Sequence, residues 1–351
     1  MTSCAAWAQV FDTDAGSAMV IDHNTGQVLL SKNADVPLPP ASMSKLMTLY
    51  MAFEALEDGR LTLQTELPVS EHAASFGGST MFLDPRDRVT VEDLIRGVVV
   101  LSGNDATVVL GEALAPDGTE DGFADMMTER ARELGMNNSV FRNASGWPAA
   151  GHLMSMRDLA TLGELLITDF PQYYPYFAET EFAFDGRSPA NRFNRNPLLR
   201  LDIGADGLKT GHTQEAGFGL VGSATQDGRR VTFVISGLDT AGQRASESER
   251  IVNWAFRQFA EEQLFDGEND PILEAEVFMG ELARVPLTTT EPLTVLIPVT
   301  GREAIQGDIS YEGPIEAPIA AGDQVATLTL THPGMLPFEV PLVAAVDVPR
   351  A

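Results

Sequence analysis

The segment PASMSKLMT at residues 40–48 places a serine and a lysine three positions apart, Ser42 and Lys45. From residue 41 onward, apolar side chains recur at intervals of three and four residues as far as Gly59. This pattern predicts an amphipathic helix with Ser42 in its first turn. Residues three apart on a helix share a face, with β-carbons about 5–6 Å apart. The lysine amine can therefore reach the serine hydroxyl.

A serine hydroxyl is a weak nucleophile at neutral pH and needs a base beside it. A lysine can be that base only when desolvation or a neighbouring cation lowers its pKa, and Lys209 could be that cation. Ser-x-x-Lys alone occurs by chance in many helices. The chain, however, has only three lysines, Lys32, Lys45 and Lys209, and leaves surface charge to Asp and Glu. We therefore expect Lys45 to be buried and to serve chemistry.

Two further polar motifs lie along the chain. Ser102-Gly103-Asn104 separates two apolar helical segments, and Lys209-Thr210-Gly211 precedes a predicted β-hairpin. Each has an ordinary interpretation, the first as a polar turn and the second as an exposed strand end with a solvated lysine. In a functional interpretation, Gly211 would let a substrate lie against the strand backbone.

The apolar patterns predict an α/β domain. One hairpin lies near the N-terminus, a second surrounds Asp227-Gly228, and the segment between them is helical. Strands from both ends of this region predict one antiparallel sheet flanked by helices. Ser155 and Asp158 have the spacing of a capping box. The predicted strands are 17–22, 27–31, 217–224 and 230–237, and the predicted helices are 41–59, 91–101, 105–114, 120–134, 155–167 and 246–259.

The hydrophobic pattern of the sequence changes beyond about residue 265. Helical periodicity vanishes, and short β-rich runs alternate with turn residues, which predicts a small all-β domain. We therefore divide the chain into a larger domain at residues 10–263 and a small β-sandwich at residues 264–351. Residues 1–9 end in a small-x-small pattern typical of an export signal, so they are either the remnant of one or a flexible N-terminus.

Composition limits the partners of this protein of 351 residues. Lys+Arg 23 against Asp+Glu 50 gives a formal net charge of -27, which disfavours binding to nucleic acid and to anionic membranes. An anionic substrate would need a local cationic pocket. The single cysteine, Cys4, excludes an internal disulfide and thiolate metal sites, and we expect no metal and no cofactor. No apolar run reaches 18 residues, so no spanning helix is predicted.

The three motifs occur in the order S-x-x-K, S-x-N and K-T-G, a signature of class A β-lactamases and penicillin-binding proteins. The chain resembles the penicillin-recognising serine hydrolases, most of all the low-molecular-mass penicillin-binding proteins of the D-alanyl-D-alanine carboxypeptidase type, peptidase family S11. The matching segments are residues 40–48, 101–106, 194–196 and 206–213. The resemblance implies a β-lactamase/transpeptidase-like α/β domain with a helical subdomain, followed by a small all-β domain.

The resemblance also assigns catalytic roles. Ser42 would attack the carbonyl between two D-alanines of a peptidoglycan stem peptide, forming an acyl-enzyme and releasing the terminal D-alanine. Lys45 would be the general base, Ser102 would relay the proton to the leaving amine, and Asn104 would hold Lys45 and the substrate amide. The backbone N–H groups of Ser42 and His212 would form the oxyanion hole.

The resemblance also implies that cationic side chains bind the terminal carboxylate of the substrate. Lys209, assigned to the catalytic set, would act with Arg244, whose alternative is a surface arginine paired with neighbouring glutamates. Arg195 could line the cleft or instead tie its loop to Asp202 or Asp206. The predicted substrate-binding residues are Thr210, Gly211, His212, Thr213, Arg195 and Arg244.

One family feature is missing from the sequence. No Glu-x-x-Leu-Asn segment lies between Ser102 and Lys209, where class A β-lactamases carry the carboxylate that activates the deacylating water. We therefore expect penicillins to acylate Ser42 and remain bound as covalent inhibitors. The alternatives are a D,D-endopeptidase or weak β-lactamase on the same fold, and a non-catalytic penicillin-sensing or peptidoglycan-binding protein.

The resemblance implies an exported, periplasmic protein that acts on peptidoglycan. Relatives usually end in an amphipathic helix that lies on the membrane surface. The sequence ends at residues 348–351 in a predicted β region. Peripheral association with the outer face of the inner membrane, through a C-terminal segment that would follow residue 351, is therefore left open.

Overall fold

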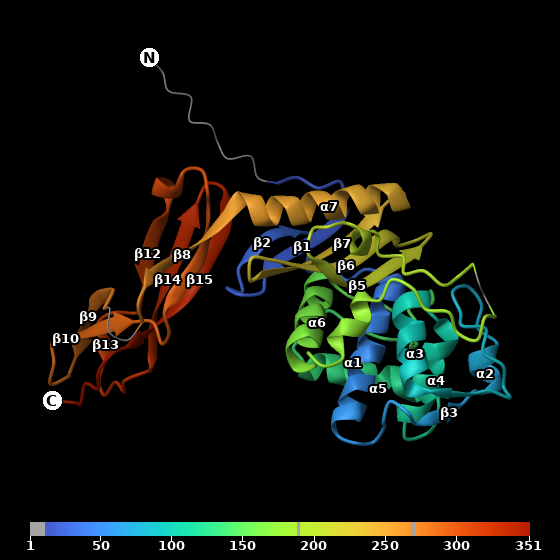
Figure 1. Ribbon diagram of the computed structural model, residues 1–351. Coiled ribbons are helices and arrows are strands. Elements are labelled where there is room, and N and C mark those ends of the chain that lie inside the picture. The colour runs from blue at the N-terminus through green and yellow to red at the C-terminus, as the bar shows by residue number, and fades with distance from the viewer. Residues whose placement is uncertain (1–10, 188–189, 268–270) are drawn as a thin grey trace, which may run out of the picture. The chain divides into compact units, whose positions relative to one another are not determined.

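A computed structural model describes residues 11–187, 190–267 and 271–351. The chain forms two compact units. The larger comprises residues 13–23 and 30–253, and the smaller consists mainly of residues 254–351. Figure 1 shows a sheet with helices in the larger unit and mainly strands in the smaller one. The predicted export-signal remnant at residues 1–9 lies outside the described residues.

The larger unit is built on a five-stranded sheet with the strand order β2-β1-β7-β6-β5. Strands from opposite ends of this region share one antiparallel sheet, as the sequence predicted, and the structure shows that β1 and β7 are neighbours in it. Asp227 and Gly228 join β6 to β7 with positive φ angles of 50° and 83°, the conformation of a tight two-residue hairpin. The strands are β1 Ser17–Asp22, β2 Val28–Lys32, β5 Ala205–Thr213, β6 Gly217–Gln226 and β7 Arg229–Leu238.

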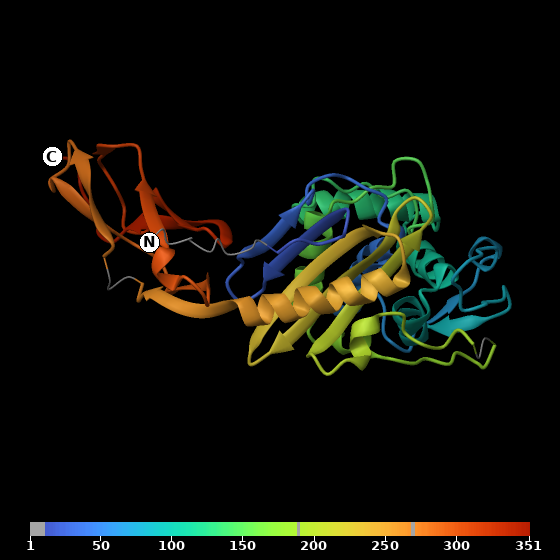
Figure 2. The same ribbon diagram turned by 90° about the horizontal axis from the view of Figure 1, so that it is seen from above.

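Helices cover both faces of this sheet (Figure 1, Figure 2). α7 (Ala241–Gln258), of which residues 241–253 belong to the larger unit, lies along one face. α6 (Met156–Asp169) lies on the other face. A β-carbon at Gly163 of α6 would lie 3.3 Å from a methyl group of Thr232, so a glycine there brings the helix close to the sheet.

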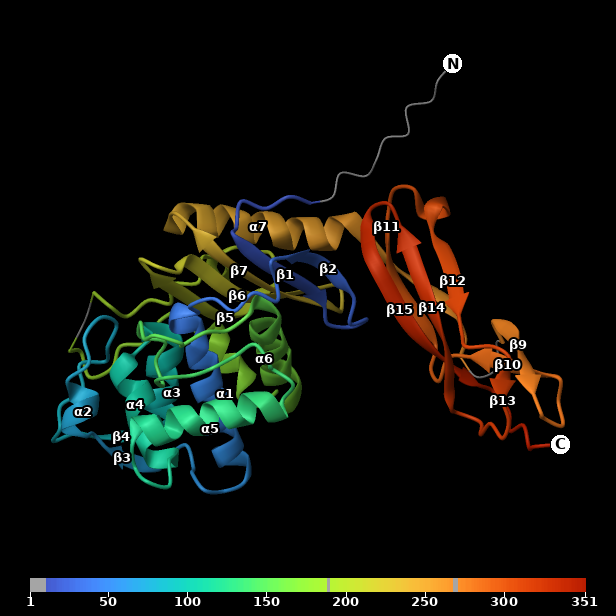
Figure 3. The same ribbon diagram turned by 180° about the vertical axis from the view of Figure 1, so that it is seen from behind.

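The helix α1 (Lys45–Glu57) is enclosed by α4 (Asn104–Leu114), α5 (Glu120–Glu133) and α6 (Figure 3). Residues 45–53 are all buried, so this helix is buried on every side and the predicted amphipathic pattern is wrong. Its predicted first turn is a separate 3-10 helix, η1 (Ala41–Ser44). Ser42 therefore precedes α1, and Lys45 begins it.

The segment predicted as one helix over residues 91–101 changes geometry midway. α3 (Val91–Arg96) continues into a π-helical turn, η2 (Gly97–Leu101). A π turn is wider than an α turn and is often found at functional sites. It ends at Ser102, whose φ of 60° and ψ of 36° are left-handed, and α4 follows. Ser102 is thereby held at the junction of two helices.

Ser155 caps α6 by accepting a hydrogen bond from the Asp158 N–H at 3.1 Å, which is the first half of the predicted capping box. The Asp158 carboxylate instead accepts from the Asn138 N–H at 2.9 Å and the Ser139 hydroxyl at 2.7 Å. It therefore fixes the preceding loop. The remaining elements of this unit are β3 Glu66–Pro68, α2 Glu71–Ala74, β4 Arg88–Thr90, η3 Tyr174–Ala178 and η4 Pro197–Arg200.

The smaller unit is all-β apart from the end of α7 and the short 3-10 turn η5 (Arg302–Ala304). One sheet has the order β12-β14-β15-β10-β9-β13, and β8 pairs with β11. Their inward side chains form a continuous apolar core. The predicted boundary between residues 263 and 264 falls inside β8. The strands are β8 Phe259–Phe265, β9 Leu273–Phe278, β10 Arg284–Thr288, β11 Leu293–Pro298, β12 Gln306–Ser310, β13 Ile315–Glu316, β14 Gln324–His332 and β15 Met335–Ala344.

Candidate active site

Ser42 is half-buried in the 3-10 turn η1. Its Oγ accepts a hydrogen bond from Lys45 Nζ at 2.9 Å. The preceding residue, Ala41, has a positive φ of 50°, which is uncommon for a residue with a side chain and sets the direction of the turn. The two side chains of the S-x-x-K motif therefore meet, with the serine outside the α-helix and the lysine inside it.

The Lys45 amine is completely buried. Besides Ser42, it donates to Asn104 Oδ1 at 2.7 Å and to the Ser145 carbonyl oxygen at 2.5 Å. Burial and, to a smaller extent, the positive charge of Arg195 lower the pKa of Lys45 to about 7. A substantial fraction of this amine is therefore uncharged at neutral pH, which a general base requires.

The second and third motifs also meet. Lys209, on β5, is almost completely buried, and its amine donates to Ser102 Oγ at 3.0 Å and to the Thr210 carbonyl oxygen at 3.2 Å. Burial lowers the pKa of Lys209 well below its ordinary value, and the charge of Lys45 lowers it further. The sequence left two origins open for the Lys45 shift, desolvation or a neighbouring cation such as Lys209. Burial is its main cause, because α1 is enclosed on all sides.

Arg244 lies next to this lysine network. Its side chain is buried, and Nη2 donates to the Arg195 carbonyl oxygen at 3.3 Å. Its guanidinium lies 5.7 Å from the centre of the Phe218 ring. Within the described ranges Arg244 forms no salt bridge, so the alternative of a surface arginine paired with glutamates is not what the structure has. Burial lowers the pKa of Arg244 to about 10.

Arg195 is held by uncharged groups. It donates to Ser79 Oγ at 2.7 Å, to the Leu101 carbonyl oxygen at 3.3 Å and to Asn191 Oδ1 at 3.0 Å. The alternative partner Asp206 binds Arg230 instead, at 2.7 Å. Arg195 therefore borders the site, and its charge acts on Lys45, Lys209 and Arg244 alike, lowering the pKa of each.

The strand β5 forms one edge of the sheet and pairs only with β6. Alternate backbone N–H and C=O groups of an edge strand point away from the sheet, where an extended peptide can use them. Thr210 is buried, Thr213 is half-buried, and the His212 ring is exposed and stacks on Phe218 with centroids 3.8 Å apart. The strand therefore offers backbone groups beside Ser42.

The structure explains the glycine at position 211 by packing inside the protein and not by the predicted approach of a substrate. A β-carbon there would lie 3.0 Å from both the Pro40 carbonyl oxygen and Met43 Cγ, and 3.3 Å from the Ala41 β-carbon. The side-chain position of this residue therefore faces η1 and not the open edge. Glycine is needed because β5 and the turn that carries Ser42 pack closely, which fixes the position of the strand relative to the serine.

The loop at residues 143–147 is a part of the site that the motif analysis missed. Asn143 Oδ1 accepts hydrogen bonds from the backbone N–H groups of Ser145, Gly146 and Trp147 at 2.8–3.2 Å. This turn directs the Ser145 carbonyl toward Lys45. Gly146 has a φ of 76°, and a β-carbon there would lie 1.9 Å from the Ala41 carbonyl oxygen. The polar run Asn-Ala-Ser-Gly signals a turn, but not its distant partner.

A second missed element is the loop that holds Asn104. The Asn104 side-chain amide donates to the Gly77 carbonyl oxygen at 2.9 Å, so its Oδ1 must face Lys45. The adjacent Asp105 carboxylate accepts from the N–H groups of Met81 and Leu83 at 2.9–3.1 Å. Asp105 is therefore engaged with the backbone and is not a catalytic carboxylate. In the described part of the chain, no three His, Cys, Asp or Glu side chains are placed to hold a metal ion.

Comparisons with known proteins agree with this arrangement. Residues 4–240 match the family model described as D-alanyl-D-alanine carboxypeptidase, Peptidase_S11, and residues 261–350 match the penicillin-binding protein 5 C-terminal domain. The chain is 34% identical to D-alanyl-D-alanine carboxypeptidase DacF of Bacillus subtilis, covering 96% of this chain and 87% of the relative. It is 35% identical to DacC of Escherichia coli K12, covering 95% and 84%.

A solved structure extends the comparison to the fold. The crystal structure of D-alanyl-D-alanine carboxypeptidase DacD from Francisella tularensis has a TM-score of 0.81 and 28% identity, covering 100% of this chain and 97% of that chain. The similarity therefore includes both the α/β part and the all-β part. The chain belongs to the D-alanyl-D-alanine carboxypeptidase family, peptidase family S11, among the low-molecular-mass penicillin-binding proteins.

Proposed function

We propose that this serine-type D-alanyl-D-alanine carboxypeptidase forms its acyl-enzyme on Ser42, with Lys45 as the general base. The observation that carries this assignment is the Lys45 amine, which is fully buried, bonded to Ser42 Oγ at 2.9 Å and shifted to a pKa of about 7. A buried amine with this pKa can take a proton from a hydroxyl at neutral pH, whereas an exposed lysine cannot.

In the acylation step, Ser42 Oγ bonds to the carbonyl carbon of the penultimate D-alanine as its proton passes to Lys45. The amide C–N bond then breaks, and the leaving D-alanine nitrogen takes a proton from the Ser102 hydroxyl. Ser102 can recover a proton from Lys209, whose amine lies 3.0 Å away. Water later attacks the ester carbonyl and gives one proton, through Ser102, to the deprotonated Lys209, while the protonated Lys45 returns its proton to Ser42 Oγ. The shortened peptide is freed, and Ser42, Lys45 and Lys209 regain their starting protonation. Asn104 keeps Lys45 aimed at the serine through its 2.7 Å hydrogen bond.

Recognition of the terminal carboxylate is assigned to the cations beside Ser102. Lys209 and Arg244 are buried, and Arg195 lies next to them, in a protein whose formal net charge is -27. Burial is the main cause of their lowered pKa values, and a carboxylate bound between them would relieve the repulsion that adds to it. The Thr210 side chain, on the same strand, would add a neutral hydrogen bond.

The developing negative charge on the substrate carbonyl oxygen is assigned to two backbone N–H groups, those of Ser42 and His212. β5 is an edge strand and packs directly against η1, since Gly211 contacts Pro40 and Met43. This packing supports a hole between the turn and the strand. One such donor is typically worth about 3 kcal/mol of the activation barrier.

Penicillins are proposed to acylate Ser42 and to leave slowly. The nearest acidic side chain to Lys45 that perturbs its pKa is Asp105, and its oxygens accept backbone N–H groups of the neighbouring loop. It is therefore a poor candidate for activating a deacylating water. The acyl-enzyme formed from a β-lactam would persist, and the drug would act as a covalent inhibitor.

The family acts on peptidoglycan peptides, and we propose that this protein works outside the cytoplasm, in the periplasm. Among the helices that the structure describes, none is both long and apolar enough to cross a membrane. Association with the outer face of the inner membrane through a further C-terminal segment is retained as part of the proposal. Fractionation of cells that produce the natural protein, with and without a high-salt wash, tests it.

The assignment of the nucleophile is tested with Ser42→Ala and with Ser44→Ala as a matched control. Ser44 belongs to the same turn, but its hydroxyl donates to the Ala41 carbonyl oxygen and not to Lys45. We expect Ser42→Ala to lose covalent labelling by a fluorescent penicillin and to slow D-alanine release from a D-Ala-D-Ala peptide by at least about 10³-fold. Labelling of the wild type without any D-alanine release would favour the penicillin-sensing alternative.

A further inference from the structure

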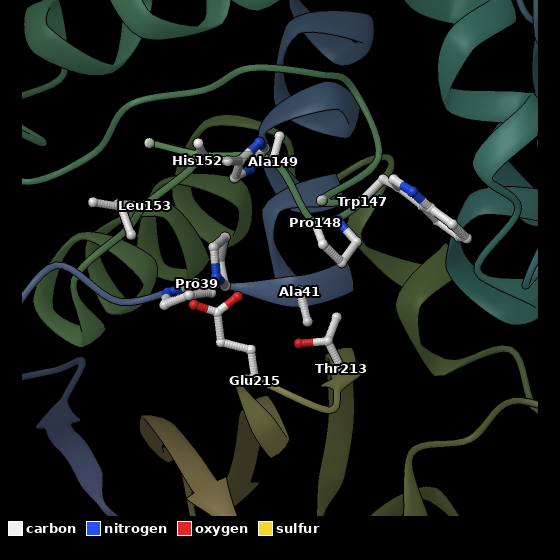
Figure 4. Close-up of a pocket in the computed structure, with 13 residues that line it drawn as sticks. Pro39, Ala41, Trp147, Pro148, Ala149, His152, Leu153, Thr213 and Glu215 are labelled. Carbon is white, nitrogen blue, oxygen red and sulfur yellow. The ribbon is translucent and has the colours of Figure 1, made fainter.

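A cavity of about 410 Å³ adjoins the turn that carries the nucleophile. Its walls are residues 39–41, the loop at residues 146–153, and Thr213 and Glu215 after the end of the K-T-G strand (Figure 4). Ligand pockets in proteins commonly have volumes of about 300–1,000 Å³. The cavity is large enough for a side chain of a bound peptide, and it begins next to the residue that precedes Ser42.

The cavity lies beyond the end of β5 that is remote from Lys209. Lys209 and Thr213 are four residues apart on one strand, which corresponds to about 13 Å. Under the proposed function, the carboxylate of the leaving D-alanine binds near Lys209 and the carbonyl oxygen binds at His212. The acyl part of the substrate, which precedes the cleaved bond, must then extend past Thr213. This path brings the acyl part of the substrate to the cavity.

The walls of the cavity are almost entirely uncharged. They consist largely of proline, alanine and glycine, with the Trp147 ring at one side. His152 is buried and uncharged, because its Nδ1 accepts the Arg142 N–H at 3.2 Å and burial lowers its pKa to about 4. The Thr213 hydroxyl already accepts the Ala216 N–H at 3.0 Å. These walls suit an aliphatic chain.

Glu215 is the one wall residue that carries a charge at neutral pH. Its side chain is exposed, and Figure 4 shows the carboxylate pointing toward Pro39 across the cavity. In the described part of the chain it forms no salt bridge, whereas many other acidic side chains are paired with arginines. An aliphatic cavity with one free carboxylate complements an aliphatic chain that ends in an ammonium group.

We propose that this cavity binds the side chain of the residue that precedes D-Ala-D-Ala in the substrate, and that Glu215 selects an aliphatic side chain with a terminal ammonium. The inference rests on the proposed function, because the acyl-enzyme on Ser42 sets the direction of the peptide. Trp147 also lines the cavity, with its ring directed away from Glu215 (Figure 4). Glu215 is a specificity-determining residue and takes no part in bond cleavage.

The test uses two peptides that end in D-Ala-D-Ala and differ only in the preceding residue, lysine or Nε-acetyllysine. We expect the wild type to have a kcat/KM about 3- to 5-fold higher for the lysine peptide, as a solvent-accessible ion pair allows. Glu215→Gln should remove this preference and leave kcat/KM for the acetylated peptide unchanged. Glu249→Gln, on an exposed part of α7, is the matched control and should keep the preference.

A second readout does not depend on turnover. The same two peptides compete with a fluorescent penicillin for Ser42, and the lysine peptide should slow labelling of the wild type more than the acetylated one. Equal competition by both peptides, or a preference that survives Glu215→Gln, overturns the subsite. Absence of D-alanine release from every peptide, with a preserved Glu215-dependent difference in competition, overturns the carboxypeptidase assignment and supports the subsite.

Discussion

Two clusters of charged residues in the larger unit are built on opposite principles. In one, at the β6–β7 turn, Arg229 lies 3.2 Å from the completely buried Asp22, and Arg230 lies 2.7 Å from Asp206. Every arginine there faces a carboxylate. In the other, around β5, cations are gathered without a carboxylate partner within salt-bridge distance in the described residues.

The paired charges of the first cluster stabilise the fold, whereas the unpaired cations of the second are suited to chemistry. A buried charge costs free energy unless it is paired, so an evenly matched pair such as Arg230 and Asp206 can hold a fold together. Lys45 and Lys209 are buried with only neutral partners, and their lowered pKa values report that cost. Strongly perturbed groups of this kind gather at functional sites, where the unpaired charge is available to a substrate.

The largest expected effect comes from removing an unpaired cation. Lys45→Met should slow penicillin acylation of Ser42 by about 10²–10⁴-fold, because the general base is lost. The unfolding free energy near pH 7 should change little, because removing a buried amine offsets the loss of its hydrogen bonds to Asn104 and the Ser145 carbonyl. Acylation rates from stopped-flow fluorescence and urea unfolding measure the two effects. A variant that is both active and strongly destabilised would make Lys45 a structural residue.

The pH dependence of the wild type sharpens the same prediction. With a pKa of about 7, Lys45 loses its proton near neutrality, so the acylation rate should rise up to pH 7 and level off above it. The folded protein binds fewer protons than the unfolded chain between pH 7 and the ordinary lysine value of 10.5, so the contribution of Lys45 to stability rises with pH in that window. Lys45→Met should lack this slope.

An intermediate effect is expected when a paired cation is removed. Arg230→Met leaves the Asp206 carboxylate without its partner and removes the 2.8 Å bond to Ser223 Oγ. We expect a loss of about 2 kcal/mol in the unfolding free energy, with little change in acylation rate. Arg88→Met is the matched control, because its pair with Glu66 is exposed and should contribute less than about 1 kcal/mol. Equal losses would remove the distinction between the clusters.

The smallest expected effect concerns Glu164, on α6, whose carboxylate lies 3.8 Å from His23. Burial raises its pKa to about 7, and the negative charge of Asp22 contributes. Its folded form holds a proton that the unfolded chain releases above pH 4.5, so stability falls as pH rises from 4.5 to 7. Glu164→Gln should therefore be about 1–2 kcal/mol more stable than the wild type at pH 8. The gain should vanish at pH 4, and a gain that persists there would contradict the assignment.

The sequence predicted the sheet well because its strands are marked by local patterns. Asp227-Gly228 predicts a hairpin turn, and the apolar runs on either side have the length of strands. The placement of strands from both ends of the region in one antiparallel sheet also followed from the order of elements, whereas the adjacency of β1 and β7 did not. The geometry of η1 did not, because the turn at Ala41–Ser44 depends on contacts with Gly146 and Gly211, which are distant in sequence.

The candidate site could be predicted only where its residues stand in recognisable motifs. Ser42, Lys45 and Lys209 carry such motifs. The structure pairs Lys45 with Ser42 and Lys209 with Ser102, and the charge of Lys45 lowers the pKa of Lys209. The Ser145 carbonyl has no side-chain signature, since any residue has a carbonyl group. Burial of Lys45 was expected from the scarcity of lysine, but the enclosure of α1 by surrounding helices, which makes burial the main cause of its pKa shift, is a packing property that local periodicity does not reveal.

The π-helical turn between α3 and Ser102 has one more consequence. Such a turn accommodates an additional residue within a helix, so its presence depends on the number of residues between two anchored points and little on which apolar side chains fill them. Gly97–Leu101 can therefore exchange one aliphatic residue for another of similar size, whereas shortening the segment by one would rotate the following hydroxyl and amide away from both lysines. Catalytic alignment here is a matter of spacing in the chain.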